Sequence, residues 1–250
     1  MGRSGVRIAV TVLTALAMHA FPRAARAQDW SWPERAENLR ALPADFPAER
    51  LSAVMRGFTR ALGVRCSYCH VGEEGQPLSA YDFPSDANPM KDRAREMYAL
   101  LGVVNDQLAG FDRSGERVNV WCHTCHNGKP RPQTLDEAVM ERWRAEGSEA
   151  AIAHFRDLRS RYFAGPAFDF RPASVAQLGN GLVQAGDTTG ARTLLEINVE
   201  DNPDAWEAHE SLGDLLSMTG DPAGAAARYE RALELSPGNA RVTAKLRAIR

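Results

Sequence analysis

The sequence predicts a mainly α protein, in which a small segment with two Cys-x-x-Cys-His motifs precedes a module of helical repeats. Three observations support this class. The motif occurs at residues 66–70 and again at 122–126, and apolar residues recur every three or four positions before each copy. Downstream, a pattern repeats with a period of 34 residues. We expect a leader over 1–27, the motif segment over 28–134, a helical connector over 135–169 and the repeats over 170–250.

The leader has the composition of a secretory signal peptide. A basic start, MGRSGVR, precedes the uncharged apolar run IAVTVLTALAM, and Ala25-Arg26-Ala27 supplies a small-x-small cleavage site. The apolar run is too short to span a bilayer. We therefore predict export to the periplasm with cleavage after Ala27. The mature chain is not expected to span a membrane, and peripheral association with one is left open.

The remaining composition is that of an ordinary globular protein. Cleavage after Ala27 leaves 26 basic against 32 acidic side chains, a net charge of −6. This balance gives no basic patch for nucleic acid, so no nucleic-acid partner is expected.

Both motifs match the attachment sequence of c-type haem. Two thiols one turn apart form thioethers with the vinyl groups of the macrocycle, and the next residue lies beneath the iron. The motif occurs twice and uses all four cysteines of a chain predicted to be exported. We therefore expect two covalently bound haem c groups, attached through Cys66, Cys69, Cys122 and Cys125.

Three other interpretations of these cysteines remain. A four-cysteine zinc site would need to bridge the 52 residues between Cys69 and Cys122, which is long for a zinc ribbon. A thioredoxin-like redox pair needs a βαβ context, and this region has no strand pattern. Two disulfides are the usual outcome for four exported cysteines, and here they would have to bridge within or across the two pairs.

The spacing also selects the proximal iron ligands. His70 and His126 directly follow the second cysteine of each motif, so we predict that these two histidines bind the irons. His123 lies between two cysteines, where its side chain points elsewhere, and is interpreted as a polar residue without a ligand role.

Each motif follows a predicted helix that carries a methionine. FPAERLSAVMRGFTRALG places Met55 on an apolar face, and Gly63 is a natural stop. NPMKDRAREMYALLGVVNDQL begins at Pro89 and places Met90, Met97, Leu101 and Leu108 on one face. Methionine is a common sixth haem ligand, yet it is also an ordinary core residue.

Three runs together resemble the cytochrome subunit of photosynthetic reaction centres and, more closely, its small diheme bacterial relatives. These runs are MRGFTRALGVRCSYCHVG, DFPSDANPMKDRAREMYALL and VNVWCHTCHNGKPRPQ. The resemblance covers about residues 40–133. It implies that Met55 is the distal ligand opposite His70, and Met97 the one opposite His126, with Met90 as the rival of Met97. The reaction-centre subunit carries four haems, so its photosynthetic role does not carry over.

The C-terminal half predicts stacked helix pairs. Thr134-Leu-Asp-Glu137 is a capping box that starts one helix, and Ser148 can open the next. His154 and His209 are expected to lie on helix surfaces. The 34-residue repeat, which is similar to tetratricopeptide repeats, aligns Leu178, Gly179, Leu182, Gly186, Asp187, Ala191, Leu195 and Pro203 with Leu212, Gly213, Leu216, Gly220, Asp221, Ala225, Tyr229 and Pro237. Residues 240–250 supply a terminal helix.

The expected function is that of a periplasmic diheme cytochrome which carries single electrons between redox protein partners and docks proteins on its repeats. No Ser-His-Asp set, phosphate-binding loop or carboxylate pair stands out, so an enzyme is not expected. Two alternatives are a haem enzyme, such as a peroxidase, with one open axial position, and an assembly scaffold that contains haem. The sequence leaves open the electron donor and acceptor, the potentials, the ligand of the repeats and the oligomeric state.

Overall fold

The computed structural model describes residues 30–111 and 118–250, and the predicted leader with its cleavage site after Ala27 lies outside the described residues. The described residues are mainly α-helical, as predicted, and an isolated antiparallel bridge joins Val71 to Asp82. None of the helices in these two ranges is long and apolar enough to cross a membrane.

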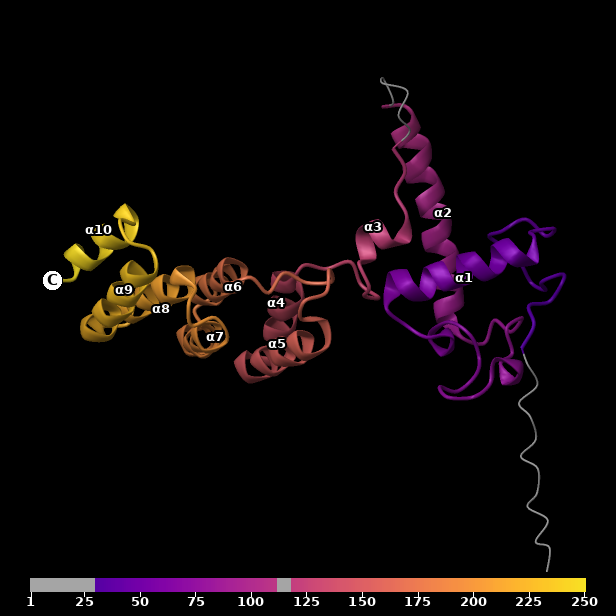
Figure 1. Ribbon diagram of the computed structural model, residues 1–250. Coiled ribbons are helices and arrows are strands. Elements are labelled where there is room, and N and C mark those ends of the chain that lie inside the picture. Colours follow the sequence, from indigo (N-terminus) through magenta and orange to yellow (C-terminus); the bar gives the residue numbers. More distant parts are fainter. Residues whose placement is uncertain (1–29, 112–117) are drawn as a thin grey trace, which may run out of the picture.

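The N-terminal half contains α1 (Ala48–Leu62), the short 3₁₀ turns η1 (Cys66–Tyr68) and η2 (Leu78–Ala80), α2 (Pro89–Ala109) and the short α3 (Cys122–His126). Helices α1 and α2 cross (Figure 1), and Phe58 meets Tyr98 edge-on there, with 6.3 Å between ring centroids. The C-terminal part of α1 packs on α3 rather than on the motif that follows it in sequence.

The predicted helix signals hold at the end of α1 and at the start of α2. Helix α1 ends at Gly63, which takes a left-handed φ of 64°. At the start of α2 the Asn88 side chain accepts a hydrogen bond from the amide of Met90, and Pro89 occupies the first helical position.

The C-terminal half consists of antiparallel helix pairs, which follow one another away from α1–α3 (Figure 1). The Thr134–Glu137 capping box forms as predicted, with both of its hydrogen bonds present. Trp143 of the first pair donates to Asp187 at 2.9 Å, which ties the connector to the repeats. The helices are α4 (Leu135–Glu146), α5 (Ser148–Tyr162), α6 (Pro172–Gln184), α7 (Thr188–Asp201), α8 (Trp206–Met218), α9 (Pro222–Leu235) and α10 (Ala240–Ala248).

The hydrophobic core lies entirely in this C-terminal half. It extends as one cluster from Leu135 to Leu246, with Phe155, Leu182, Leu195 and others almost fully buried. Within residues 30–111 and 118–134, by contrast, the only buried apolar side chains are Leu51 and Ala61.

The predicted apolar face of α2 is partly covered. Met90, Leu101 and Leu108 are half-buried, whereas Met97 of the same face is 48% exposed. Leu100 and Val103, which lie outside the predicted face, are 52% and 58% exposed, and none of the 21 residues of α2 is buried. Periodicity therefore identifies the face that makes contacts, but it does not predict the exposed apolar side chains beside it.

The expectation that His209 lies on a helix surface is wrong, because the residue is buried. It is 4% exposed, and its Nε2 lies 2.9 Å from the carbonyl oxygen of Pro203. The repeat stack covers this histidine because α8 is the most deeply buried helix, packed against both α7 and α9.

Two glycines of the repeat allow close helix contact. A Cβ on Gly179 would meet Leu195, and a Cβ on the equivalent Gly213 would lie 2.7 Å from the ring of Tyr229. The 34-residue spacing thus repeats a packing contact as well as a pattern of residue types.

We predict opposite effects for two glycine-to-alanine substitutions. Gly213→Ala should lower the free energy of unfolding by about 1–3 kcal/mol, because the added methyl group collides with Tyr229. Gly181→Ala in α6, where a Cβ meets nothing within 4 Å, should raise it by about 0.5–1 kcal/mol. Urea unfolding followed by circular dichroism measures both, and equal effects would contradict the close packing at Gly213.

Candidate functional site

The first Cys-x-x-Cys-His motif forms a single tight turn. Cys66 opens η1, and its carbonyl oxygen accepts hydrogen bonds from the amides of Cys69 and His70 at 3.2 and 2.9 Å. The turn therefore brings both thiols and the imidazole together on one short piece of backbone. Both thiols are half-buried and free of disulfides.

The second motif is a short helix. Cys122 and Cys125 are one turn apart on α3, and His126 is its last residue. Trp121 stands just before the helix, and its amide donates to the Thr124 hydroxyl at 3.0 Å. Both cysteines are again free, and Cys125 is exposed.

Burial raises the pKa of one thiol in each motif. Burial, and secondarily Cys66, raises the pKa of the Cys69 thiol. Burial is also the main reason that the pKa of Cys122 is raised. Thioredoxin-like cysteines need the opposite shift, because the thiolate is the nucleophile. Within the described residues, no group of three or more His, Cys, Asp or Glu gathers as a metal site, so the two pairs do not meet in a four-cysteine cluster.

His126 is buried and held in one orientation. Its exposure is 8%, and its Nδ1 lies 3.0 Å from the carbonyl oxygen of Lys129. Since a carbonyl can only accept, Nδ1 is the donor of this bond, and Nε2 is the ring nitrogen that remains for another partner. This is the usual arrangement of a metal-binding histidine, whose second nitrogen donates to a backbone oxygen. His123 is exposed, in agreement with a residue that has no ligand role.

His70 lies against an aromatic cluster. Its ring is 5.0 Å from that of Phe83, which also contacts Trp30 at 5.1 Å and stacks on Tyr81 at 5.4 Å. Burial, followed by the charge of Lys91, lowers the pKa of His70, so the imidazole is neutral. Its Nδ1 is buried and has no hydrogen-bond partner.

A network of ion pairs holds the loop that carries Phe83. The Lys91 ammonium donates to the carbonyl oxygens of Phe83, Pro84 and Ser85 at 2.8–2.9 Å. The Asp86 carboxylate accepts from Asn38 at 2.9 Å and pairs with Arg95 at 2.9 Å. These hydrogen bonds hold the pKa of Asp86 well below its usual range. The network fixes Phe83, and with it the aromatic wall beside His70.

The predicted distal ligands occupy different environments. Met55 lies in the middle of α1 and Met90 in the first turn of α2, and both are half-buried. Met97 is 48% exposed and lies on the predicted apolar face of α2. Phe111, Val118 and Trp121 are also 60–76% exposed. The role of each methionine as a ligand stays a prediction.

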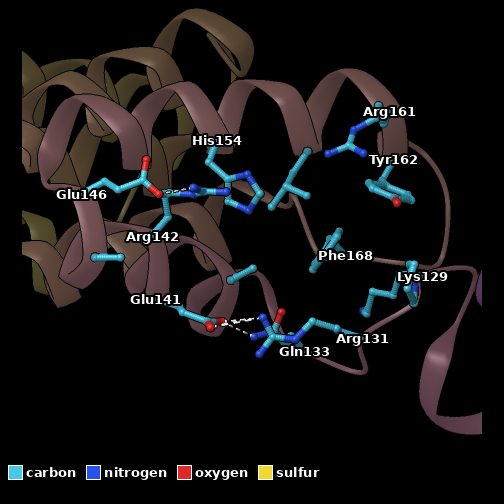
Figure 2. A pocket seen from close by; sticks show the side chains of 14 residues that line it. Lys129, Arg131, Gln133, Glu141, Arg142, Glu146, His154, Arg161, Tyr162 and Phe168 are labelled. Carbon is cyan, nitrogen blue, oxygen red and sulfur yellow. Dashed lines mark hydrogen bonds and ion pairs between the residues drawn. The ribbon is translucent and has the colours of Figure 1, made fainter. Parts of the chain in front are cut away.

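A pocket of about 430 Å³ is lined by α4, by α5 and by the segment that follows the second motif (Figure 2). Its charges are largely paired: Arg131 meets Glu141 at 2.9 Å, and Arg142 pairs with Glu146. Lys129 lies at one end of the pocket and is only 6% exposed. Burial lowers the pKa of its ammonium group.

Sequence reasoning missed Lys129 and Asp86. Neither belongs to a periodic pattern, and both owe their position to contacts with residues 38–48 positions away in the chain. The Lys129-Pro130 pair, which follows the second motif after Asn127 and Gly128, was the available signal for Lys129, and it has no single structural meaning.

Comparison with known proteins concerns the C-terminal half. A family model described as tetratricopeptide repeat matches residues 177–240. No curated protein matches the chain. One similar solved structure is the first TPR of Spaghetti (RPAP3) bound to the HSP90 peptide SRMEEVD, at 21% identity and a TM-score of 0.33, covering 46% of this chain and 86% of that one. The first TPR domain of human RPAP3 is similar at 22% identity, with the same TM-score and coverage. The family match, together with the 34-residue packing repeat, identifies residues 177–240 as tetratricopeptide repeats.

Proposed function

We propose that the chain is a periplasmic diheme c-type cytochrome, which carries single electrons between redox protein partners and docks proteins on its tetratricopeptide repeats. One observation carries this proposal. Both Cys-x-x-Cys-His motifs, with free thiols, lie in a segment of about 100 residues that has almost no apolar core of its own. A polypeptide of this size needs buried apolar area to fold, and two haem groups would provide it.

The residues fit covalently attached haem at both motifs. Thioether formation adds a thiol S–H across a vinyl double bond, so it requires thiols that are outside disulfides, as all four are. The bond from His126 to Lys129 leaves Nε2 available to an iron, and His70 is neutral and has an unpartnered buried nitrogen. When bound, each haem would supply an iron that takes up and releases one electron.

The chain's own residues would perform three tasks. The thiols anchor the groups, and the two histidines hold the irons from one side. The apolar side chains of α2, with Trp121, would cover the macrocycles and exclude water, which favours rapid electron exchange over bond chemistry. The helical repeats offer a surface for a partner protein, as tetratricopeptide stacks generally do.

One competing function depends on Met97. If Met97 is not a ligand, the haem at the second motif would have an open axial position. An open axial position would permit a small molecule to bind iron, as in a haem enzyme.

We predict two haem groups per chain. A pyridine haemochrome spectrum of the exported protein should report two thioether-linked haems, and the double variant Cys122→Ser/Cys125→Ser should retain one, because serine forms no thioether. His123→Ala serves as a matched control and should retain both. Purified protein that contains zinc and no haem would overturn the proposal.

Substitution of the methionines separates the two candidate functions. Met55→Leu and Met97→Leu should each convert one haem to high spin or lower its potential, because leucine preserves the volume but cannot bind iron. Met90→Leu is the control and should change neither haem. If Met97→Leu leaves both potentials and the Met–Fe(III) charge-transfer band unchanged while Met55→Leu does not, the second haem has another distal ligand or none.

A further inference from the structure

The turn after the second motif is closed by two hydrogen bonds between the same two residues. His126 donates through Nδ1 to the Lys129 carbonyl oxygen at 3.0 Å, and the Lys129 amide donates to the His126 carbonyl oxygen at 3.1 Å. Asn127 and Gly128 between them have left-handed φ values of 49° and 84°. The position of the Lys129 backbone therefore sets the plane of the His126 imidazole.

The Lys129 side chain points from this turn into the helical module. Its ammonium donates to the carbonyl oxygen of Ala167 and lies 4.2 Å from the ring centroid of Phe168 (Figure 2). Lys129 is 6% and Ala167 5% exposed. A buried ammonium that has lost its water depends on these partners, because moving away from them would leave a charge unsatisfied.

The segment that Lys129 contacts, Ala167 and Phe168, packs on the core of the C-terminal half. Phe168 meets Tyr162 of α5 edge-on at 5.4 Å and Phe170 at 6.2 Å. Phe170 in turn contacts the fully buried Phe155 at 6.0 Å. The segment that joins α5 to α6 is thus fixed by the same aromatic packing that holds the first helices of the module together.

We propose that Lys129 is a positioning residue through which the helical module sets the orientation of the His126 imidazole. The inference rests on the proposed function, in which His126 binds haem iron, and extends it: the α5–α6 segment becomes part of the environment of one haem and not of the other. The residues that orient a metal-binding histidine through its second nitrogen would then include Ala167 and Phe168, about 40 positions further along the chain.

If the contacts of the Lys129 ammonium had a purely structural role, their removal would change the free energy of unfolding of the chain. It would leave the plane of the His126 imidazole unaltered. The orientation of the ligand is therefore the quantity that separates the two roles, and the hyperfine-shifted haem methyl resonances of the oxidised protein report it for each haem.

The test compares three variants of the full-length protein with its haems attached. Lys129→Met keeps the aliphatic part of the side chain and removes the ammonium. Phe168→Leu keeps the ammonium and removes the aromatic ring that it contacts. Both should alter the methyl pattern of one haem and leave the other unchanged. The reduction equilibrium of that haem should shift by roughly tenfold, which corresponds to about 59 mV for one electron.

Arg131→Met is the matched control, because it removes the same charge two residues further along from an exposed side chain paired with Glu141. It should leave the methyl patterns of both haems unchanged. Wild-type methyl patterns in both Lys129→Met and Phe168→Leu, or an equal change in Arg131→Met, would overturn the positioning role. Haem content measured on the same samples distinguishes the two failures: a wild-type protein without two haems overturns the proposed function itself.

Discussion

The apolar core begins at Leu135, and this boundary constrains every other feature of the molecule. From Leu135 to Leu246 each helix pair buries leucine, alanine and aromatic side chains against the next. Before it, α1 and α2 bury almost nothing, although α2 presents methionine, leucine and valine along one face. Burial of apolar area is the main favourable contribution to folding, and the N-terminal half has little of it. In the function proposed above, two macrocycles attached at Cys66/Cys69 and Cys122/Cys125 would supply the missing apolar area.

In the N-terminal half, hydrogen bonds and ion pairs, rather than buried apolar side chains, hold the loops and motifs in place. The Asp86 network fixes the loop that carries Phe83 beside His70. The amide of Gly128 donates to the carbonyl oxygen of Ala61 at 2.8 Å, which joins the second motif to the end of α1. Gly63 lies so close to Gly128 that a Cβ would collide with its backbone. These contacts hold the two motifs in place at points around the apolar face, and Lys129 connects the second motif to the helical module.

The sequence allowed much of this architecture to be predicted, for reasons that are local. The Gly63 stop, Pro89 in the first turn of α2, the Thr134 cap and the 34-residue repeat act over a few residues or at a fixed period, so α1, α2, α4 and the repeats could be placed correctly. The assignment of His70 and His126 as iron ligands also came from spacing, and it stays a prediction. What could not be predicted depends on distant contacts: the burial of Lys129 against Ala167, the Asp86 network, and the burial of His209 in the repeat stack. The face of α2 that carries Met90, Leu101 and Leu108 was predicted and is half-buried, but the exposed Leu100 and Val103 beside it were not predicted.

Amide hydrogen exchange of the full-length chain, produced with and without haem attachment, tests the proposal that the N-terminal half folds around two haem groups. We expect amides of α1 and α2 to be protected only in the haem-loaded protein, and amides of α6–α9 to be protected to the same extent in both. Equal protection of α1 and α2 without haem would overturn the proposal, because it would show that these helices have sufficient packing of their own.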